Sequence, residues 1–179
     1  MVVLVTGGAQ QPVLFLDVDG VLIPYGLGPA PDSATVLMAG PDADDEMLSR
    51  INPALGPRLL SLGCDLVWAT GWEDEANDVI SPRVNLPRPP VLEWSSADLE
   101  SGPARLHWKT RGLVACAGGR PFVWVDDEIS EADRDWVVLD HPAPALLYLI
   151  DSHVGLSEAD IGVIERWLND LHATDWVPQ

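Results

Sequence analysis

The chain has 179 residues, of which 47% are hydrophobic, and a formal net charge of −18 at pH 7. This length and apolar content are typical of a folded domain with a substantial core and argue against a disordered chain. No apolar stretch approaches the roughly 18–20 residues that a membrane-spanning helix needs, and the negative charge repels nucleic acids and anionic membranes at long range.

Apolar runs that end in polar residues predict the strands of a buried parallel sheet. Turn-rich or helical stretches separate these runs from one another. The expected strands are Val13–Leu16, 65–70 (DLVWAT), Val91–Trp94, 121–128 (PFVWVDDE) and 136–140 (WVVLD).

Helices are expected between and after these strands. Asn52 and Pro53 supply a cap residue and a first-turn proline, and Ser157 with Asp160 has the spacing of a capping box. The expected helices are Pro53 to Gly63, 71–80, 104–117 and 158–171, and a proline-rich loop is expected from Ser81 to Pro90.

The alternation of strands and helices predicts an α/β fold, with a central parallel sheet covered by helices on both faces. The sequence contains no internal repeat and no linker, so residues 1–179 are expected to form a single domain. Ligands of such sheets bind beyond the carboxyl ends of the strands. Asp17, Thr70 and Asp126 each stand at that end of a different predicted strand, so we expect them to converge.

The converging side chains are rich in carboxylates. Asp19 follows Asp17 by two residues, and Asp127 follows Asp126 directly. Like charges a few ångströms apart repel strongly at low effective dielectric constant, so the cluster needs a cation. A set of ligands that are all oxygen suits Mg²⁺. The same repulsion favours one carboxyl that keeps its proton near neutral pH, as a general acid must.

A lysine and a hydroxyl complete the predicted site. Lys109 is the only lysine of the chain, against nine arginines, which indicates that a compact ammonium is needed there. Thr70 offers a hydroxyl in the sequence WATGW, and Gly71 lets the backbone approach an oxyanion closely. A helix that starts at this point would add free N–H groups. Trp72 and Tyr25 are candidate contacts for a substrate.

In this order, DVDGVL, Thr70, Lys109 and VDD resemble the signature motifs of the haloacid dehalogenase (HAD) superfamily of aspartyl-phosphate hydrolases, over residues 13–128. The resemblance implies a Rossmann-like three-layer sandwich, dependence on Mg²⁺ and a covalent phospho-aspartate. It also implies roles for single residues. Asp17 would be the nucleophile and a metal ligand, and Asp19 the general acid/base, with its backbone carbonyl also on the metal. Thr70, Gly71 and Lys109 would bind the phosphate, Asp126 would be a further metal ligand, and Asp127 would support these ligands from behind or contact the metal through a water molecule.

Members of this superfamily usually carry a cap that selects the substrate. Here residues 23–51 are expected to form a short flap or a minimal cap. The 38 residues between Thr70 and Lys109 leave no room for a large cap domain. In this respect the chain is most similar to the small HAD domains that occur fused in RNA-repair proteins.

These features predict a Mg²⁺-dependent phosphomonoester hydrolase whose substrate is a nucleotide-like or other small phosphorylated molecule. A polynucleotide-end phosphatase with the same chemistry is an alternative that an open site would admit, but the net charge of −18 provides no basic track for its backbone. A HAD-fold binding module without turnover is a second alternative. Cys64 and Cys116 match no metal or redox spacing, which fits reduced thiols and a cytoplasmic location.

Overall fold

The computed structural model describes residues 11–26, 46–94 and 106–173. Within these ranges, four parallel strands form one sheet in the order β2-β1-β3-β4. The strands are β1 (Val13–Leu16), β2 (Asp65–Trp68), β3 (Phe122–Asp126) and β4 (Ala145–Leu149).

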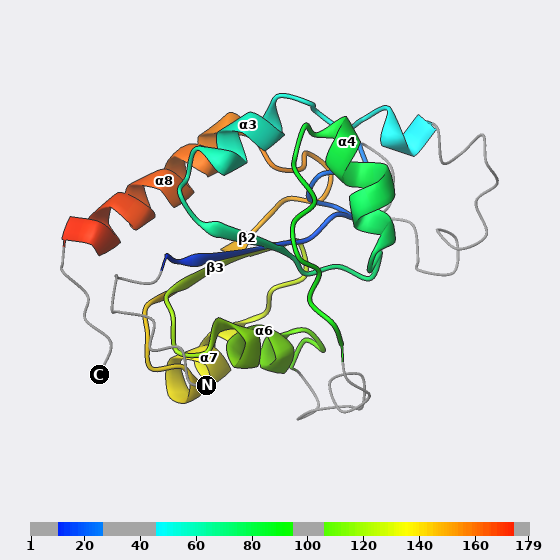
Figure 1. The fold of residues 1–179 in the computed structure, drawn as a ribbon. Helices are drawn as coiled ribbons and strands as arrows, with labels where there is room; N and C mark the ends of the chain where they lie inside the picture. Colours follow the sequence, from blue (N-terminus) through cyan, green and yellow to red (C-terminus); the bar gives the residue numbers. More distant parts are fainter. Residues whose placement is uncertain (1–10, 27–45, 95–105, 174–179) are drawn as a thin grey trace, which may run out of the picture.

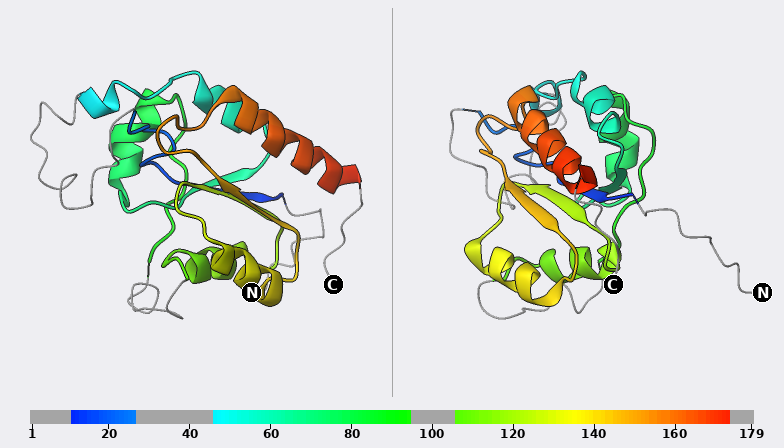
Figure 2. Two further views of the ribbon diagram at one scale, coloured as in Figure 1. Left: turned by 180° about the vertical axis from the view of Figure 1, so that it is seen from behind. Right: turned by 90° about the vertical axis from the view of Figure 1, so that its left-hand side faces the viewer.

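Helices cover both faces of this sheet (Figures 1 and 2). On one face lie α3 (Leu55–Leu60), the π-helix η1 (Ala76–Ile80) with α4 (Ser81–Arg83) directly after it, and the long C-terminal α8 (Glu158–Ala173). On the other face lie α6 (Thr110–Ala117) and α7 (Glu131–Asp140). The predicted Rossmann-like α/β sandwich is therefore confirmed, and the described ranges contain no large cap domain.

The two faces of the sheet bury two separate apolar clusters. Along β1, alternation sends Leu14 and Leu16 toward α3 and α8, and Val13 and Phe15 toward α6 and α7. All four side chains are completely buried. A strand that is covered on both sides is mostly apolar, which explains why β1 and residues 122–125 of β3 appear in the sequence as uninterrupted apolar runs.

The strand register brings the acidic residues together. Leu16 pairs with Trp68 of β2 on one side and with Val125 of β3 on the other. Asp17, which follows Leu16, therefore comes next to Asp126 at the end of β3. Because β2 is the other neighbour of β1, the loop that carries Thr70 leaves the sheet at the same edge.

The prediction of a strand at 136–140 is wrong, because these residues form the second half of α7. Ser130 and Asp133 cap this helix with reciprocal hydrogen bonds, which favour helical backbone at the following residues. Val137 is buried, whereas Val138 and Leu139 are 80% and 83% exposed, so the apolar run is not a buried strand. The fourth strand is β4 instead.

Several predicted elements differ at their boundaries. The Asn52 side chain accepts the Ala54 N–H and its carbonyl accepts the Leu55 N–H, so a turn precedes α3 and the helix begins at Leu55. The helix that was expected to begin at 104 begins at Thr110. Val91 forms an isolated bridge with Trp68 rather than a strand.

The capping box predicted at Ser157 and Asp160 is confirmed. It lies at the start of α8, and Ile161, Ile164 and Leu168 are buried on one face of that helix. Gly118 closes α6 with a φ of +59°. Most of the expected flap lies outside the described residues. No helix in the described ranges is both long and apolar enough to cross a bilayer.

Candidate active site

A buried lysine lies between two aspartates at the carboxyl edge of the sheet. The Lys109 ammonium is 2.7 Å from Asp17 Oδ2 and 2.8 Å from Asp126 Oδ2. Asp17 follows β1, Asp126 ends β3, and Lys109 directly precedes α6, so three separate elements supply the three groups. All three residues are less than 10% exposed. The structure thus brings together three residues that the sequence places in one site.

The charges of this cluster perturb one another. Burial raises the pKa of Asp17, and Asp126 raises it further, while Lys109 acts in the opposite direction. Burial opposes the charged form of Lys109, but Asp17 and Asp126 outweigh this effect and raise the pKa of the ammonium. Lys109 therefore keeps its positive charge, and the Asp17 and Asp126 carboxyls share this single charge.

The donor set fits a divalent cation. One carboxylate oxygen each from Asp17, Asp126 and Asp127 can be chosen so that all three lie within 4.8 Å of one another. Hard oxygen ligands of this kind suit Mg²⁺. Burial raises the pKa of Asp127 to about 6, with further contributions from Asp126 and Glu128. The carboxylates of this cluster carry more negative charge than the single Lys109 ammonium balances. A bound cation would reduce this excess.

Gly20 allows Asp127 to approach this cluster. Its φ is +67°, and a Cβ built on Gly20 would overlap the Asp127 carboxylate and lie 3.0 Å from the Cβ of Ser152. A residue with a side chain would therefore have to displace Asp127 and would also be strained in its backbone. Gly20, the glycine of the DVDG sequence, thus leaves the space that the Asp127 carboxylate occupies in the acidic cluster.

Asp19 lies beside this cluster and has a partner that the sequence did not indicate. The indole Nε1–H of Trp72 donates to Asp19 Oδ2 over 2.9 Å. Asp19 Oδ1 is buried and has no hydrogen-bond partner among the described residues. Burial raises the pKa of Asp19, while the hydrogen bond from Trp72 and the charge of Lys109 lower it.

The loop after β2 holds the predicted phosphate-binding hydroxyl. Thr70 is completely buried, its Oγ1 accepts the Trp72 N–H over 3.3 Å, and its carbonyl accepts the Trp94 indole N–H over 3.2 Å. Gly71 is exposed, with open space where a Cβ would lie. The helix expected to begin at Gly71 begins only at Ala76, so it does not place its free N–H groups beside Gly71.

The reason for this late start lies in the loop itself. The Thr70–Trp72 hydrogen bond forms a turn, and Glu73 has a φ of 48°, which no α-helix accommodates. The helix also continues through Ser81–Arg83, where the sequence predicts a loop.

Tyr25 lies within the electric field of the acidic cluster. Burial raises the pKa of its phenol, and the charges of Asp127, Asp19 and Asp17 raise it further. Its carbonyl accepts a hydrogen bond of 2.8 Å from Arg50. Of the two predicted substrate contacts, Trp72 is bonded directly to Asp19, and the roles of Tyr25 and Trp72 in substrate binding stay predictions.

Two residues near Lys109 were missed by sequence reasoning. Asp133 accepts hydrogen bonds from the His107 N–H, the Thr110 hydroxyl and both donors of Ser130. His107 accepts the Lys109 N–H at Nδ1 and lies 3.2 Å from Glu128 at Nε2. The Ser130–Asp133 spacing is a capping signal that could have located Asp133, whereas no sequence pattern indicates its contacts to the turn before α6.

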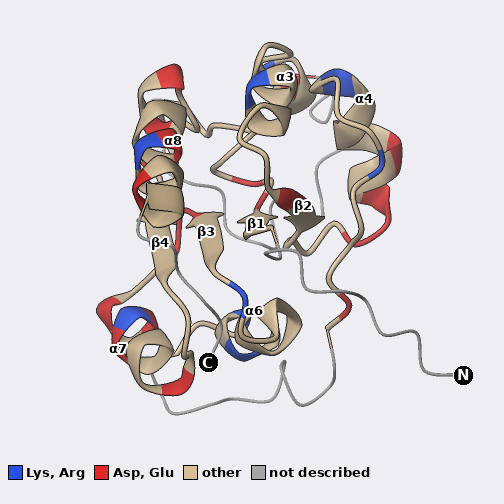
Figure 3. Ribbon diagram, turned by 60° about the vertical axis from the view of Figure 1, so that its left-hand side comes forward, with Lys and Arg blue, Asp and Glu red and all other residues tan. Residues whose placement is uncertain are grey.

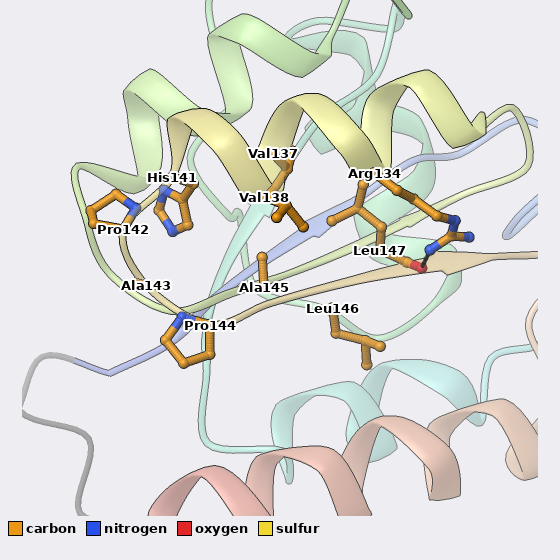
Figure 4. A pocket seen from close by; sticks show the side chains of 10 residues that line it. All are labelled: Arg134, Val137, Val138, His141, Pro142, Ala143, Pro144, Ala145, Leu146 and Leu147. Carbon is orange, nitrogen blue, oxygen red and sulfur yellow. Dashed lines mark hydrogen bonds between the residues drawn. The ribbon is translucent and has the colours of Figure 1, made fainter.

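The cavity between α7 and β4 lies apart from this cluster. It has a volume of about 590 Å³ and includes Val137, Val138 and His141 among its lining residues (Figure 4). The Arg134 guanidinium donates to the Leu147 carbonyl at its rim over 2.6 Å. None of the residues of the acidic cluster lines it, so the cavity gives the cluster no binding pocket.

The distribution of charge bears on the kind of ligand. Figure 3 shows acidic residues over α7, α8 and the region of α4, and basic residues in short segments separated from one another. Several arginines are paired with acids: Arg58 with Glu158, Arg88 with Asp78, and Arg120 with Asp65. The described ranges therefore present no continuous basic track.

Comparison with known families places these residues in one of them. The family described as "HAD domain in Swiss Army Knife RNA repair proteins" matches residues 13–161, a range that includes the whole acidic cluster. Comparisons with the curated proteins and with the solved structures found no match.

Proposed function

We propose that this chain, which belongs to the family of HAD domains in Swiss Army Knife RNA repair proteins, is a Mg²⁺-dependent phosphomonoester hydrolase that forms an aspartyl-phosphate on Asp17. Membership of the family supports a hydrolase of the phosphatase type. The observation that carries the finer proposal is the buried Asp17–Lys109–Asp126 cluster, in which a carboxylate at a strand end is held by a fixed ammonium.

In the first step, a carboxylate oxygen of Asp17 attacks phosphorus and the bond to the leaving oxygen breaks. Attack by an anion on an anionic phosphate requires positive charge close by, and Lys109 supplies it. The Thr70 hydroxyl and the open backbone at Gly71 are the proposed contacts of the other phosphoryl oxygens.

Asp19 is the proposed proton carrier. As an acid it gives its proton to the departing oxygen, and as a base it then takes a proton from the water that hydrolyses the acyl phosphate. That hydrolysis releases inorganic phosphate and restores the Asp17 carboxylate. Burial raises the pKa of Asp19, which is the direction that a proton carrier requires.

The side chains of Asp17, Asp126 and Asp127 would hold the metal ion, with the Asp19 carbonyl as a further proposed ligand, so that Asp127 would bind the ion directly instead of supporting the other ligands from behind. When bound, Mg²⁺ supplies positive charge that offsets the carboxylates and the phosphate oxygens. Between turnovers, Lys109 already compensates part of this charge.

The experiment measures release of 4-nitrophenol from 4-nitrophenyl phosphate by the purified protein, with Mg²⁺ and with EDTA. We expect turnover that EDTA removes and that Asp17→Asn reduces to the background rate. Asp135→Asn, at an exposed position of α7, is the matched acid-to-amide control and should retain activity. Turnover by Asp17→Asn equal to that of the unchanged protein would contradict the proposal. Mg²⁺ binding without any turnover would point to a binding module instead.

The family description favours a second candidate, a phosphatase that acts on RNA ends. The scattered, paired arginines argue for a small phosphorylated molecule instead. The two candidates separate on a panel of nucleoside monophosphates and of oligoribonucleotides with 3′- or 5′-phosphates, each at two salt concentrations. A preference for oligonucleotides that weakens steeply with salt would establish the RNA-end activity.

A further inference from the structure

The side chain of Trp72 connects two loops of the site. It stands on the loop after β2, and its indole Nε1–H donates over 2.9 Å to Asp19 Oδ2 on the loop after β1. Its own backbone N–H donates to the buried Thr70 hydroxyl, and its ring packs against the apolar cluster beneath α3 and α8. Trp72 is therefore held by two hydrogen bonds and one packing contact, and its bond to Asp19 orients the Asp19 carboxyl.

The chemistry of the indole group decides which oxygen of Asp19 can carry a proton. An indole N–H donates and never accepts, so the oxygen that it contacts must offer a lone pair. Oδ2 is thus held as the acceptor. The carbonyl oxygen of a protonated carboxyl is a better acceptor than its hydroxyl oxygen, so a proton on this carboxyl favours Oδ1, which is buried and has no hydrogen-bond partner among the described residues. A buried oxygen without a partner is uncommon in folded proteins, and here it leaves Oδ1 as the oxygen of this carboxyl that no neighbouring side chain holds.

We propose that Trp72 is a positioning residue that fixes Asp19 Oδ1 as the proton-carrying atom, so that the proton passes to the leaving oxygen of the substrate. This inference rests on the proposed phosphomonoesterase function and assigns Trp72 a role beyond contact with the substrate. Its effect is greatest where the leaving group needs a proton most. A good leaving group departs as an anion, whereas a poor one departs only as it is protonated.

The test compares two substrates of similar shape, 4-nitrophenyl phosphate and phenyl phosphate, in the presence of Mg²⁺. Trp72→Phe keeps an aromatic ring and removes the N–H. We expect it to lower kcat/KM for phenyl phosphate about tenfold more than for 4-nitrophenyl phosphate, since general acid catalysis contributes roughly 10²–10⁴-fold to such reactions. The matched control is Trp94→Phe, which removes an indole hydrogen bond to the Thr70 carbonyl without touching Asp19; it should affect both substrates equally.

A second variant protects the test against misfolding. Benzothienylalanine at position 72 replaces the indole N–H by sulfur and keeps the shape of the side chain. It should reproduce the selective loss of Trp72→Phe while its melting temperature stays close to that of the unchanged protein. Equal losses on both substrates, or no loss, in this variant would overturn the assignment of Trp72. The proposed function fails separately, if the unchanged protein does not hydrolyse either ester.

Discussion

Lys109 Nζ lies 2.7 Å from Asp17 Oδ2, and both side chains are almost completely buried. An ion pair in such a place depends on both partners, because removal of one leaves a buried charge without compensation. The same contact links the stability of the fold to the proposed chemistry. The lysine that supports the Asp17 carboxylate is also the cation that would meet the phosphate.

Replacement of this lysine should therefore destabilise the metal-free protein. We expect Lys109→Met to lower the free energy of unfolding by about 3–5 kcal/mol, because Asp17 and Asp126 are left facing each other. Arg111→Met, at an exposed position two residues later, should change it by no more than about 0.5 kcal/mol. Urea unfolding in EDTA measures both. Equal stability of the two variants would contradict the role assigned to Lys109.

Replacement of Gly20 should weaken metal binding, whereas replacement of a glycine elsewhere with the same backbone conformation should not. Gly20→Ala displaces the Asp127 carboxylate and should weaken Mg²⁺ binding about tenfold or more, as disturbed ligand positions do. Gly63→Ala is the matched control, because Gly63 has nearly the same φ, +68°, and open space around its Cβ position. Both variants should lose about 1 kcal/mol or more of stability to backbone strain. Isothermal titration with Mg²⁺ should find normal affinity only in Gly63→Ala.

Stability should also fall as the pH rises through the titration of Asp127. Burial, then Asp126 and Glu128, raise the pKa of this carboxyl to about 6. A pKa that is higher in the folded than in the unfolded protein contributes stability that is complete below the unfolded value and is lost as pH rises through the folded value. Metal-free protein should thus lose unfolding free energy between about pH 4 and pH 7. Asp127→Asn should reduce this slope, and an unchanged slope would count against the cluster.

Asp133 should matter for both stability and turnover. Hydrogen bonds from Ser130 and Thr110 outweigh the effect of burial and lower its pKa, so its stabilising contribution exists above the unfolded pKa and is lost as the pH falls. Asp133→Asn places an amide NH₂ among donors and should cost about 2–4 kcal/mol. It should also lower kcat, because the turn that carries Lys109 is no longer held. Asp135→Asn, two residues later and exposed, should change neither quantity.

The sequence predicts those residues of the site that stand at the ends of strands. Asp17 and Asp126 end apolar runs, and parallel strands place such ends at one edge, so their convergence follows from the pattern alone. The apolar run at 136–140 was misleading, because exposed Val138 and Leu139 on α7 look like a buried strand. Because the last strand is predicted at 136–140, β4 is not predicted. Two prolines come shortly before β4.

Hydrogen bonds between segments far apart in the chain could not be predicted from the sequence. The Trp72–Asp19 hydrogen bond joins residues 53 positions apart, and the bond from the His107 N–H to Asp133 spans 26. Neither has a periodic or spacing signal. Both depend on where the folded sheet places its loops, and the late start of the helix after β2 has the same origin, in the turn that Thr70 and Trp72 form.

A covalent bond between phosphorus and Asp17 is the central step of the proposed mechanism, and mass spectrometry of the trapped intermediate detects it. Asp19→Asn should form the acyl phosphate and hydrolyse it slowly, since the base for the second step is missing. Brief incubation of this variant with 4-nitrophenyl phosphate and Mg²⁺, followed by acid quench and peptide mapping, should find one phosphoryl group on Asp17, absent with EDTA and in Asp17→Asn/Asp19→Asn. A phosphoryl group on another residue, or its persistence in the double variant, would contradict the role of Asp17 as nucleophile.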